Sequence, residues 1–86
     1  MNVELGKQPR KYMSRCTQST YDRLNKALSD LQDLQGDIKK LHGRKDEYRI
    51  KVPPYRIIFK YDKTTKVIIV TRIDVRGDVY KMGVLI

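Results

Sequence analysis

The sequence has few of the residues and segments that identify a protein class. It contains one cysteine, Cys16, one histidine, His42, and no tryptophan. A single cysteine excludes an internal disulfide and is typical of a protein in a reducing compartment. No apolar run approaches the ~20 residues of a membrane span, and residues 1–11, MNVELGKQPRK, lack the apolar segment of a secretory signal. We therefore expect a cytoplasmic protein without membrane association.

Motifs for cofactor, metal and nucleophilic chemistry are also missing. The chain has no P-loop, no GxGxxG, no Cys/His cluster and no Ser/His/Asp set. Its carboxylates are scattered, whereas a metal-dependent nuclease needs several Asp or Glu side chains together. His42 has no ligand or nucleophile partner nearby, so we expect a surface or hydrogen-bonding role, with base stacking on RNA as the alternative. We expect neither a metal nor a cofactor.

Positive charge is what the chain has in excess. The net charge is +9 over 86 residues, and positions 39–76 hold 12 Lys and Arg against 4 Asp and Glu, a net charge of +8. The other 48 residues are nearly neutral. A localised basic field concentrates polyanions, so nucleic acid is the first partner class to consider. A solubilising surface is the alternative reading of the same charge.

The order of helix and strand patterns predicts an α+β fold in a single domain, residues 1–86. Residues 2–5 indicate a short edge strand, and a brief helix follows from Pro9 to Cys16. Thr17 and Ser19 offer capping oxygens for a second helix ending before Gly36. Its apolar stripe consists of Tyr21, Leu24, Leu28 and Leu31, widened by Ala27 and Leu34. Two helices joined this closely form a hairpin that must cover one face of a sheet.

Three strands are expected after the hairpin, in a small and mainly antiparallel sheet. They occupy residues 47–52, 55–61 and 66–73, and residues 37–43 are expected to be a linker anchored by Ile38 and Leu41. Strand 66–73 is apolar on both sides through Val70, which predicts a central strand or one covered on both faces. Its register against residues 55–61 stays open, because the intervening loop can close with an even or an odd count.

Alternation in the first two of these strands separates apolar from basic side chains. In strand 47–52, one face carries Tyr48, Ile50 and Val52. In strand 55–61, one face carries Tyr55, Ile57, Phe59 and Tyr61. If both apolar rows line one core, then Arg49, Lys51 and Arg56 stand together on the opposite surface. Beyond the third strand Gly77 permits a bend, and residues 79–85 can pack back over the sheet. That return would bring Arg76 and Tyr80 next to the three cations.

These five side chains, Arg49, Lys51, Arg56, Arg76 and Tyr80, can support one reaction of RNA without a metal. The 2′-OH attacks the adjacent phosphate, and the 5′ oxygen leaves. Cations stabilise the phosphorane charge, a lysine or tyrosine accepts the 2′-OH proton, and an arginine shields or protonates the leaving oxygen. Tyr80 could also stack on a base. The flanking cations expected to bind RNA are Arg44, Lys45, Lys60, Arg72 and Lys81.

Three motifs resemble those of the RelE/ParE superfamily, the toxins of bacterial type II toxin–antitoxin systems. They are LHGRKDEYRIKV at 41–52, PYRIIFKYD at 54–62 and DVRGDVYK at 74–81. The resemblance implies two helices on one face of an antiparallel sheet of about four strands. For the RelE branch it also implies cleavage of mRNA in the ribosomal A site. It further implies a cognate antitoxin, which we expect to be an acidic protein that wraps the toxin.

The same resemblance assigns site residues motif by motif. Arg49 and Lys51 match the two basic residues of the first strand, and Arg56 matches the arginine after the next strand's tyrosine. Arg76 and Tyr80 match the closing arginine and tyrosine, although the segment between them is shorter than in the RelE pattern. Arg49 stands where that pattern has lysine, and arginine is a poor proton acceptor. Lys51 is therefore the better candidate base.

Three functions remain open from the sequence. The first is a ribosome-dependent mRNA endoribonuclease, which the basic set plus the terminal tyrosine favours. The second is a ParE-like inhibitor of DNA gyrase, which acts by protein binding without catalysis. The third is a basic RNA-binding module without catalytic activity, for which a steep salt dependence without cleavage would be typical.

Overall fold

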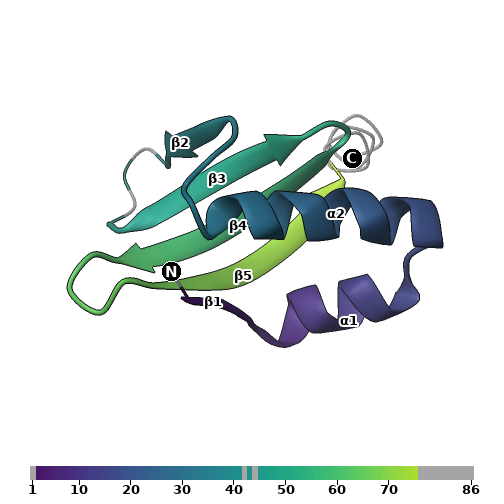
Figure 1. Cartoon of the computed structure of the whole chain (residues 1–86), viewed down its shortest axis with the longest axis horizontal. Coiled ribbons are helices and arrows are strands. Elements are labelled where there is room, and N and C mark those ends of the chain that lie inside the picture. The colour runs from purple at the N-terminus through teal and green to yellow at the C-terminus, as the bar shows by residue number, and fades with distance from the viewer. Residues whose placement is uncertain (1, 42, 44, 76–86) are drawn as a thin grey trace.

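The computed structural model describes residues 2–41, 43 and 45–75 of the chain. Its elements are β1 (Asn2–Leu5), α1 (Lys7–Arg15), α2 (Gln18–Leu31), β2 (Ile38–Lys40), β3 (Glu47–Val52), β4 (Tyr55–Asp62) and β5 (Val67–Val75). The described strands form one mixed sheet in the order β1-β5-β4-β3-β2, with β1 parallel to β5 and all other pairs antiparallel. The α+β fold with an N-terminal helical hairpin is confirmed (Figure 1).

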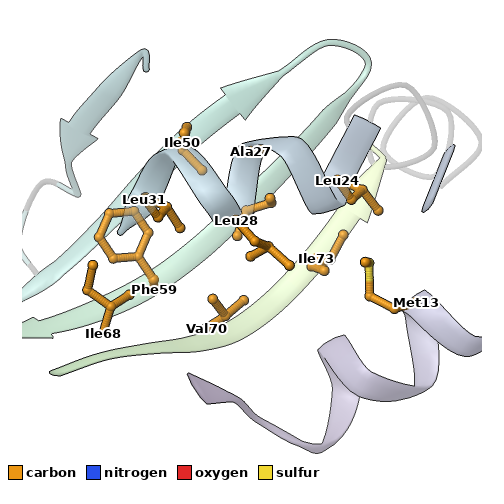
Figure 2. Close-up of a cluster of buried hydrophobic side chains, with 11 residues drawn as sticks. Met13, Leu24, Ala27, Leu28, Leu31, Ile50, Phe59, Ile68, Val70 and Ile73 are labelled. Atoms are coloured by element: carbon orange, nitrogen blue, oxygen red, sulfur yellow. The ribbon is translucent and has the colours of Figure 1, made fainter. Parts of the chain in front are cut away.

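The core lies between α2 and one face of the sheet. Leu24, Ala27, Leu28 and Leu31 are the buried residues of α2. They pack with Ile50, Ile57, Phe59, Ile68, Val70 and Ile73 from the three longest strands, and with Met13 from α1 (Figure 2). The predicted apolar rows of β3 and β4 therefore face the helices, and the alternating basic side chains face away from them. We call that side of β2–β5, which neither described helix covers, the open face.

The predicted apolar stripe of α2 is wrong at its two ends. Tyr21 is 40% exposed and Leu34 is 39% exposed. Helical periodicity gives the direction of a side chain but not whether sheet lies beneath that turn, and the start of α2 extends past the strand ends (Figure 1). The helix begins as expected, since the Thr17 hydroxyl accepts a hydrogen bond from the Thr20 N–H at 3.3 Å.

The helix ends at Leu31 rather than just before Gly36. The chain turns through Leu34 at φ 53° and then through Gly36 at φ 113°. A Cβ at position 36 would lie 2.7 Å from Cδ1 of Ile50, so the glycine permits both this backbone conformation and close approach to β3. The prediction that Gly36 directly follows the last helical residue is wrong, because α2 ends at Leu31 with Gln32 as its C-cap.

Residues 38–40 correct the prediction that 37–43 is a linker. They form β2, with Ile38 opposite Ile50 and Lys39 opposite Arg49. Ile38 is partly buried against the core, as expected for an anchor. Three residues are too few for an alternating pattern to identify a strand, so the sequence alone does not predict β2.

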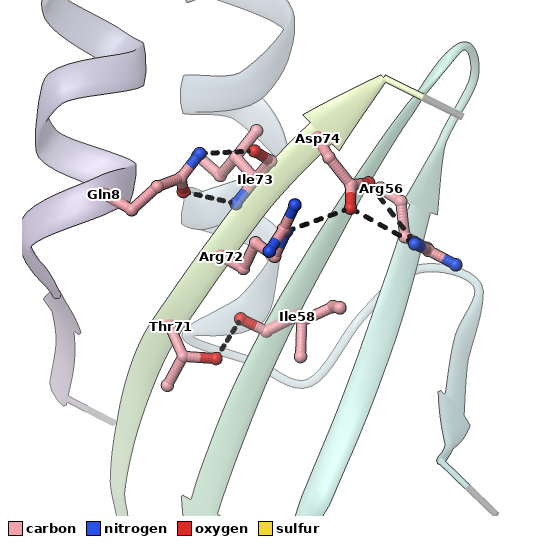
Figure 3. Close-up of polar contacts among 7 residues, drawn as sticks. All are labelled: Gln8, Arg56, Ile58, Thr71, Arg72, Ile73 and Asp74. Atoms are coloured by element: carbon pink, nitrogen blue, oxygen red, sulfur yellow. Dashed lines mark hydrogen bonds and ion pairs between the residues drawn. The ribbon is translucent and has the colours of Figure 1, made fainter. Parts of the chain in front are cut away.

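A β-bulge decides the register that the sequence left open. Ile58 pairs with Arg72, but Phe59 pairs with Val70, so Thr71 is the extra residue on β5. The Thr71 hydroxyl donates to the Ile58 carbonyl at 3.3 Å (Figure 3). Val70 and Ile73 are three positions apart and would face opposite sides of a regular strand, but the bulge allows both to face the core.

The central position of β5 is confirmed, since β1 and β4 flank it. Its second apolar side is not fully covered, because Ile69 is 44% exposed. The predicted return of residues 79–85 lies outside the described residues. Among the helices described, none combines the length and apolar character needed to cross a membrane.

Candidate active site

The strand register brings Arg49, Lys51 and Arg56 together on the open face. Lys51 lies directly opposite Arg56 in the β3–β4 pair, and Arg49 lies two residues along β3 from Lys51. Directly paired residues on one face have Cβ atoms roughly 5 Å apart. One phosphate group could therefore contact Lys51 and Arg56 at the same time.

Arg56 is held by a carboxylate that the sequence analysis did not place in the site. Its Nε donates to Oδ1 of Asp74 at 3.3 Å, and its Nη2 donates to Oδ2 at 3.1 Å (Figure 3). The Asp74 side chain is only 12% exposed, against 34% for Arg56. Bidentate charge-assisted pairs of this kind fix the plane of a guanidinium. Because arginine has five N–H donors, three stay available for a phosphate.

Arg72 binds the same carboxylate from two positions along β5. Its Nε lies 3.3 Å from Oδ2 of Asp74, and its side chain is 62% exposed. One carboxylate therefore joins two arginines and leaves the group with a net positive charge. Alternation along β5 places Asp74 and Arg72 on the same face of the sheet, and this could be predicted from the sequence. Which face they share depends on the bulge, which the sequence did not predict.

Arg49 is anchored at the other side of the site. Its Nη1 donates to the backbone carbonyl of Asp37 at 3.2 Å and lies 3.8 Å from the Asp37 carboxylate. The Arg49 side chain is 19% exposed. This contact connects β3 to the residue just before β2. Asp37, which was predicted to belong to a linker, therefore positions Arg49.

Lys51 differs from the two arginines beside it. It is half-buried, and no ion pair or side-chain hydrogen bond engages its ammonium group within residues 2–41, 43 and 45–75. Its backbone N–H donates to the Asp37 carbonyl at 3.2 Å, which fixes the main chain at this position. The site thus has an uncommitted lysine between two anchored guanidinium groups.

The other predicted residues are only partly brought together. Lys60 and Arg72 are exposed on the open face, whereas Lys45 is exposed in the turn before β3. The remaining predicted residues, Arg44, Arg76, Tyr80 and Lys81, lie outside the described part of the chain, as does His42. One further cation, Lys39 in β2, lies opposite Arg49 and was not among the predicted residues. Within the described residues, no group of three or more His, Cys, Asp or Glu is placed to hold a metal ion.

Comparison with known families identifies the chain. Residues 4–80 match the family model described as the ParE toxin of the type II toxin–antitoxin system parDE. The chain belongs to this toxin family. A search of the curated proteins returned no significant match.

Solved structures similar to this toxin are RelE proteins. The RelE chain of a RelE–RelB complex from Pyrococcus horikoshii OT3 matches at 26% identity and a TM-score of 0.73, over 88% of this chain and 94% of that one. The RelB–RelE antitoxin–toxin complex from Methanococcus jannaschii matches at 26% identity and 0.74, over 93% and 98%. The isolated E. coli RelE toxin, at 22% identity and 0.75 over 96% and 94%, shares the fold. The protein is thus a toxin of a toxin–antitoxin module with a RelE-like fold.

Proposed function

We propose that this toxin is a metal-independent endoribonuclease that cleaves mRNA, with its reacting groups on the open face. The observation that carries the proposal is the placement of Lys51, without an ionic partner in the described chain, between the anchored Arg49 and Arg56. Such an arrangement offers a group that can exchange a proton beside groups that hold fixed positive charge.

The proposed reaction breaks one phosphodiester bond. Lys51 acts as the base and accepts the proton of a ribose 2′-OH on Nζ. The 2′ oxygen bonds to the adjacent phosphorus, the bond from phosphorus to the 5′ oxygen breaks, and the 5′ oxygen takes up a proton from water. The products are a 2′,3′-cyclic phosphate and a 5′-hydroxyl. The free N–H groups of Arg56 stabilise the extra negative charge on the phosphorane. We assign Arg49 to phosphate binding, Arg76 to the leaving oxygen and Tyr80 to proton transfer or base stacking.

The proposed setting is a translating ribosome in the cytoplasm. A site without a histidine or metal should react slowly unless the RNA is held in the reactive geometry, and a message fixed in the ribosomal A site would be held so. Two of the RelE structures that resemble this chain at 26% identity are complexes with RelB antitoxins. We therefore also propose an antitoxin partner, with acidic segments that neutralise the open face.

Expression in cells tests the proposal. We would induce the toxin and map new 5′ ends on one message carried in a translated and an untranslated form. Cleavage of the translated form alone is expected, and Lys51→Met or Arg56→Ala should abolish it while the protein stays folded. Lys26→Met, at an exposed position on α2, is the matched control. If Lys51→Met and Arg56→Ala fold and cut as efficiently as wild type, the proposal is wrong.

A second candidate function is inhibition of DNA gyrase without catalysis. It is favoured by the description of the matching family model, which is that of a ParE toxin. On this account the open face binds protein, and the toxin causes DNA cleavage complexes while translation continues. The same induced cells distinguish the two functions, because intact messages with broken chromosomal DNA would favour gyrase.

A further inference from the structure

Helix α1 has an unusual distribution of charge. Its sequence, KQPRKYMSR, contains Lys7, Arg10, Lys11 and Arg15 and no acidic residue. All four cations are exposed. Pro9 and Met13 are the residues that α1 buries. The cations therefore occupy the side of α1 that faces away from the protein, which we call the α1 basic face.

Apart from Arg15, which is favourably placed in the last turn, this charge is unfavourable for the helix itself. Lys7 and Arg10 lie near the N-terminus, where the helix dipole favours negative groups. The pairs Lys7–Lys11 and Lys11–Arg15 are four residues apart, a spacing at which like charges cost roughly 0.2–0.5 kcal/mol each. The N-cap residue, Gly6, makes no side-chain capping bond. A residue pattern that opposes local stability in this way is expected where a function requires it.

Tertiary contacts hold α1 in place despite its charge. The Gln8 side-chain amide donates to the Ile73 carbonyl at 2.8 Å and accepts from the Ile73 N–H at 2.9 Å, as a neighbouring strand would (Figure 3). Met13 joins the core beside Leu24 and Ile73 (Figure 2). The anchoring residues are uncharged, so none of the four cations is needed to hold α1 against the sheet. Arg10 donates one N–H, from Nε, to the Gly6 carbonyl at 3.3 Å and keeps its other donors for a partner.

The α1 basic face is separate from the open face. Figure 1 shows α1 alongside the β1–β5 edge of the sheet, not over the surface that carries Arg49, Lys51 and Arg56. No ion pair within the described residues engages Lys7, Arg10, Lys11 or Arg15. Lys11 and Arg15 also border a surface hollow of about 480 Å³, whose described lining includes Gln8, Tyr12 and Cys16.

We propose that the α1 basic face binds the phosphate backbone of structured RNA. Lys7, Lys11 and Arg15 succeed one another every four residues, which spaces them about 6 Å apart along the axis. Interfaces with nucleic acid are polar and strongly positive, whereas protein interfaces depend on buried apolar or aromatic anchors. Among the described residues, the large apolar side chains that are exposed are Tyr21, Leu34 and Ile69, and none of them belongs to α1. This favours RNA over an acidic protein as the partner.

The inference goes beyond the proposed function, because it needs no cleavage. A double-stranded segment bound at α1 would retain the toxin on a large RNA while a single strand enters the open face. Recognition would be by shape and backbone charge, which is how proteins commonly read duplex RNA.

The test is binding of the full-length chain to a duplex of about 16 base pairs with 2′-O-methyl riboses, which cannot be cut by 2′-OH attack. The double variant Lys7→Gln/Lys11→Gln is compared with Lys26→Gln/Lys63→Gln, which removes the same charge at exposed positions on α2 and in the β4–β5 turn. We expect the α1 variant to bind roughly tenfold more weakly, and its log–log salt slope to be shallower by about 1.5. The control should change by less than twofold.

Two results would overturn this inference. Equal losses in the two double variants would mean that net charge alone matters. A greater loss of affinity for a poly-glutamate peptide than for the duplex would assign the face to an acidic protein. Circular dichroism verifies folding, and Arg10→Gln/Arg15→Gln repeats the comparison should the first variant unfold. Message cleavage is measured separately with the Lys51 variants, so failure here leaves the proposed nuclease activity intact.

Discussion

Asp74 on β5 accepts two hydrogen bonds from Arg56 on β4, and the pair links the two strands near the end of β5. The carboxylate also binds Arg72, so a single negative group fixes two of the cations expected to contact RNA. It orients Arg56 but also lowers the positive charge that attracts the substrate. Binding and cleavage should therefore respond in opposite directions when Asp74 loses its charge.

Asp74→Asn tests that relationship. The open face loses one negative charge, so RNA binding should strengthen. Cleavage should slow, because Arg56 is no longer held in one orientation. Loss of the charge-assisted bonds should also cost about 1–2 kcal/mol of unfolding free energy. The measurements are the dissociation constant for an uncleavable RNA and the single-turnover cleavage rate. Asp22→Asn, the same change at an exposed site on α2, should leave both unchanged. A variant that cuts faster would show that Asp74 inhibits rather than orients.

Lys51→Arg separates charge from proton transfer. The positive charge stays, so RNA binding should change little, but guanidinium is a much weaker proton acceptor than an amine. Cleavage should fall by roughly 10²–10⁴-fold, the usual contribution of general acid–base catalysis. Lys60→Arg is the matched control on the same face. Retention of full cleavage in Lys51→Arg would assign the base to another residue.

Leu24→Ala and Leu34→Ala make the same chemical change in two environments. Leu24 is fully buried and Leu34 is 39% exposed. The first should lower the unfolding free energy by about 2–5 kcal/mol, and the second by less than about 1 kcal/mol. Urea titration measures both. Comparable losses would contradict the end of α2 at Leu31.

Lys7→Glu should improve stability while weakening RNA binding. A carboxylate in the first turn of α1 interacts favourably with the helix dipole, which should add about 0.3–1 kcal/mol. Affinity for duplex RNA should fall because a cation of the α1 basic face becomes an anion. Thermal melting and anisotropy report the two effects. A destabilised variant with unchanged RNA binding would contradict both claims, that the charge of Lys7 opposes helix stability and that it contributes to RNA binding.

The sequence predicted most of the fold because the main elements are long enough to show their periods. Residues 47–52 alternate cleanly and are bounded by turn residues, and β3 occupies the same range. Leu24, Leu28 and Leu31 repeat at helical spacing and are buried as expected. The motif resemblance to RelE/ParE toxins supplied the family, which the match over residues 4–80 confirms.

What the sequence missed depends on contacts between distant residues. The bulge at Thr71 sets which face Arg72 and Asp74 occupy, and no local pattern encodes it. β2 is too short to alternate visibly. The positive charge of α1 did not show in the net charge, because the 48 residues outside positions 39–76 also contain acidic residues that nearly cancel it. The observed bounds of α1, Lys7–Arg15, exclude all of those acids and include four cations.

The most direct measurement of the central claim is the chemistry of the cut ends. A ribosome programmed with a defined message would be incubated with the purified toxin, once with an all-ribose message and once with a single 2′-deoxyribose just before the cut. The account predicts 5′-hydroxyl and 2′,3′-cyclic phosphate ends in the first case, no cut at that position in the second, and no product from Lys51→Met in either. New ends with a 5′-phosphate, or unaltered cleavage of the 2′-deoxy message, would contradict it.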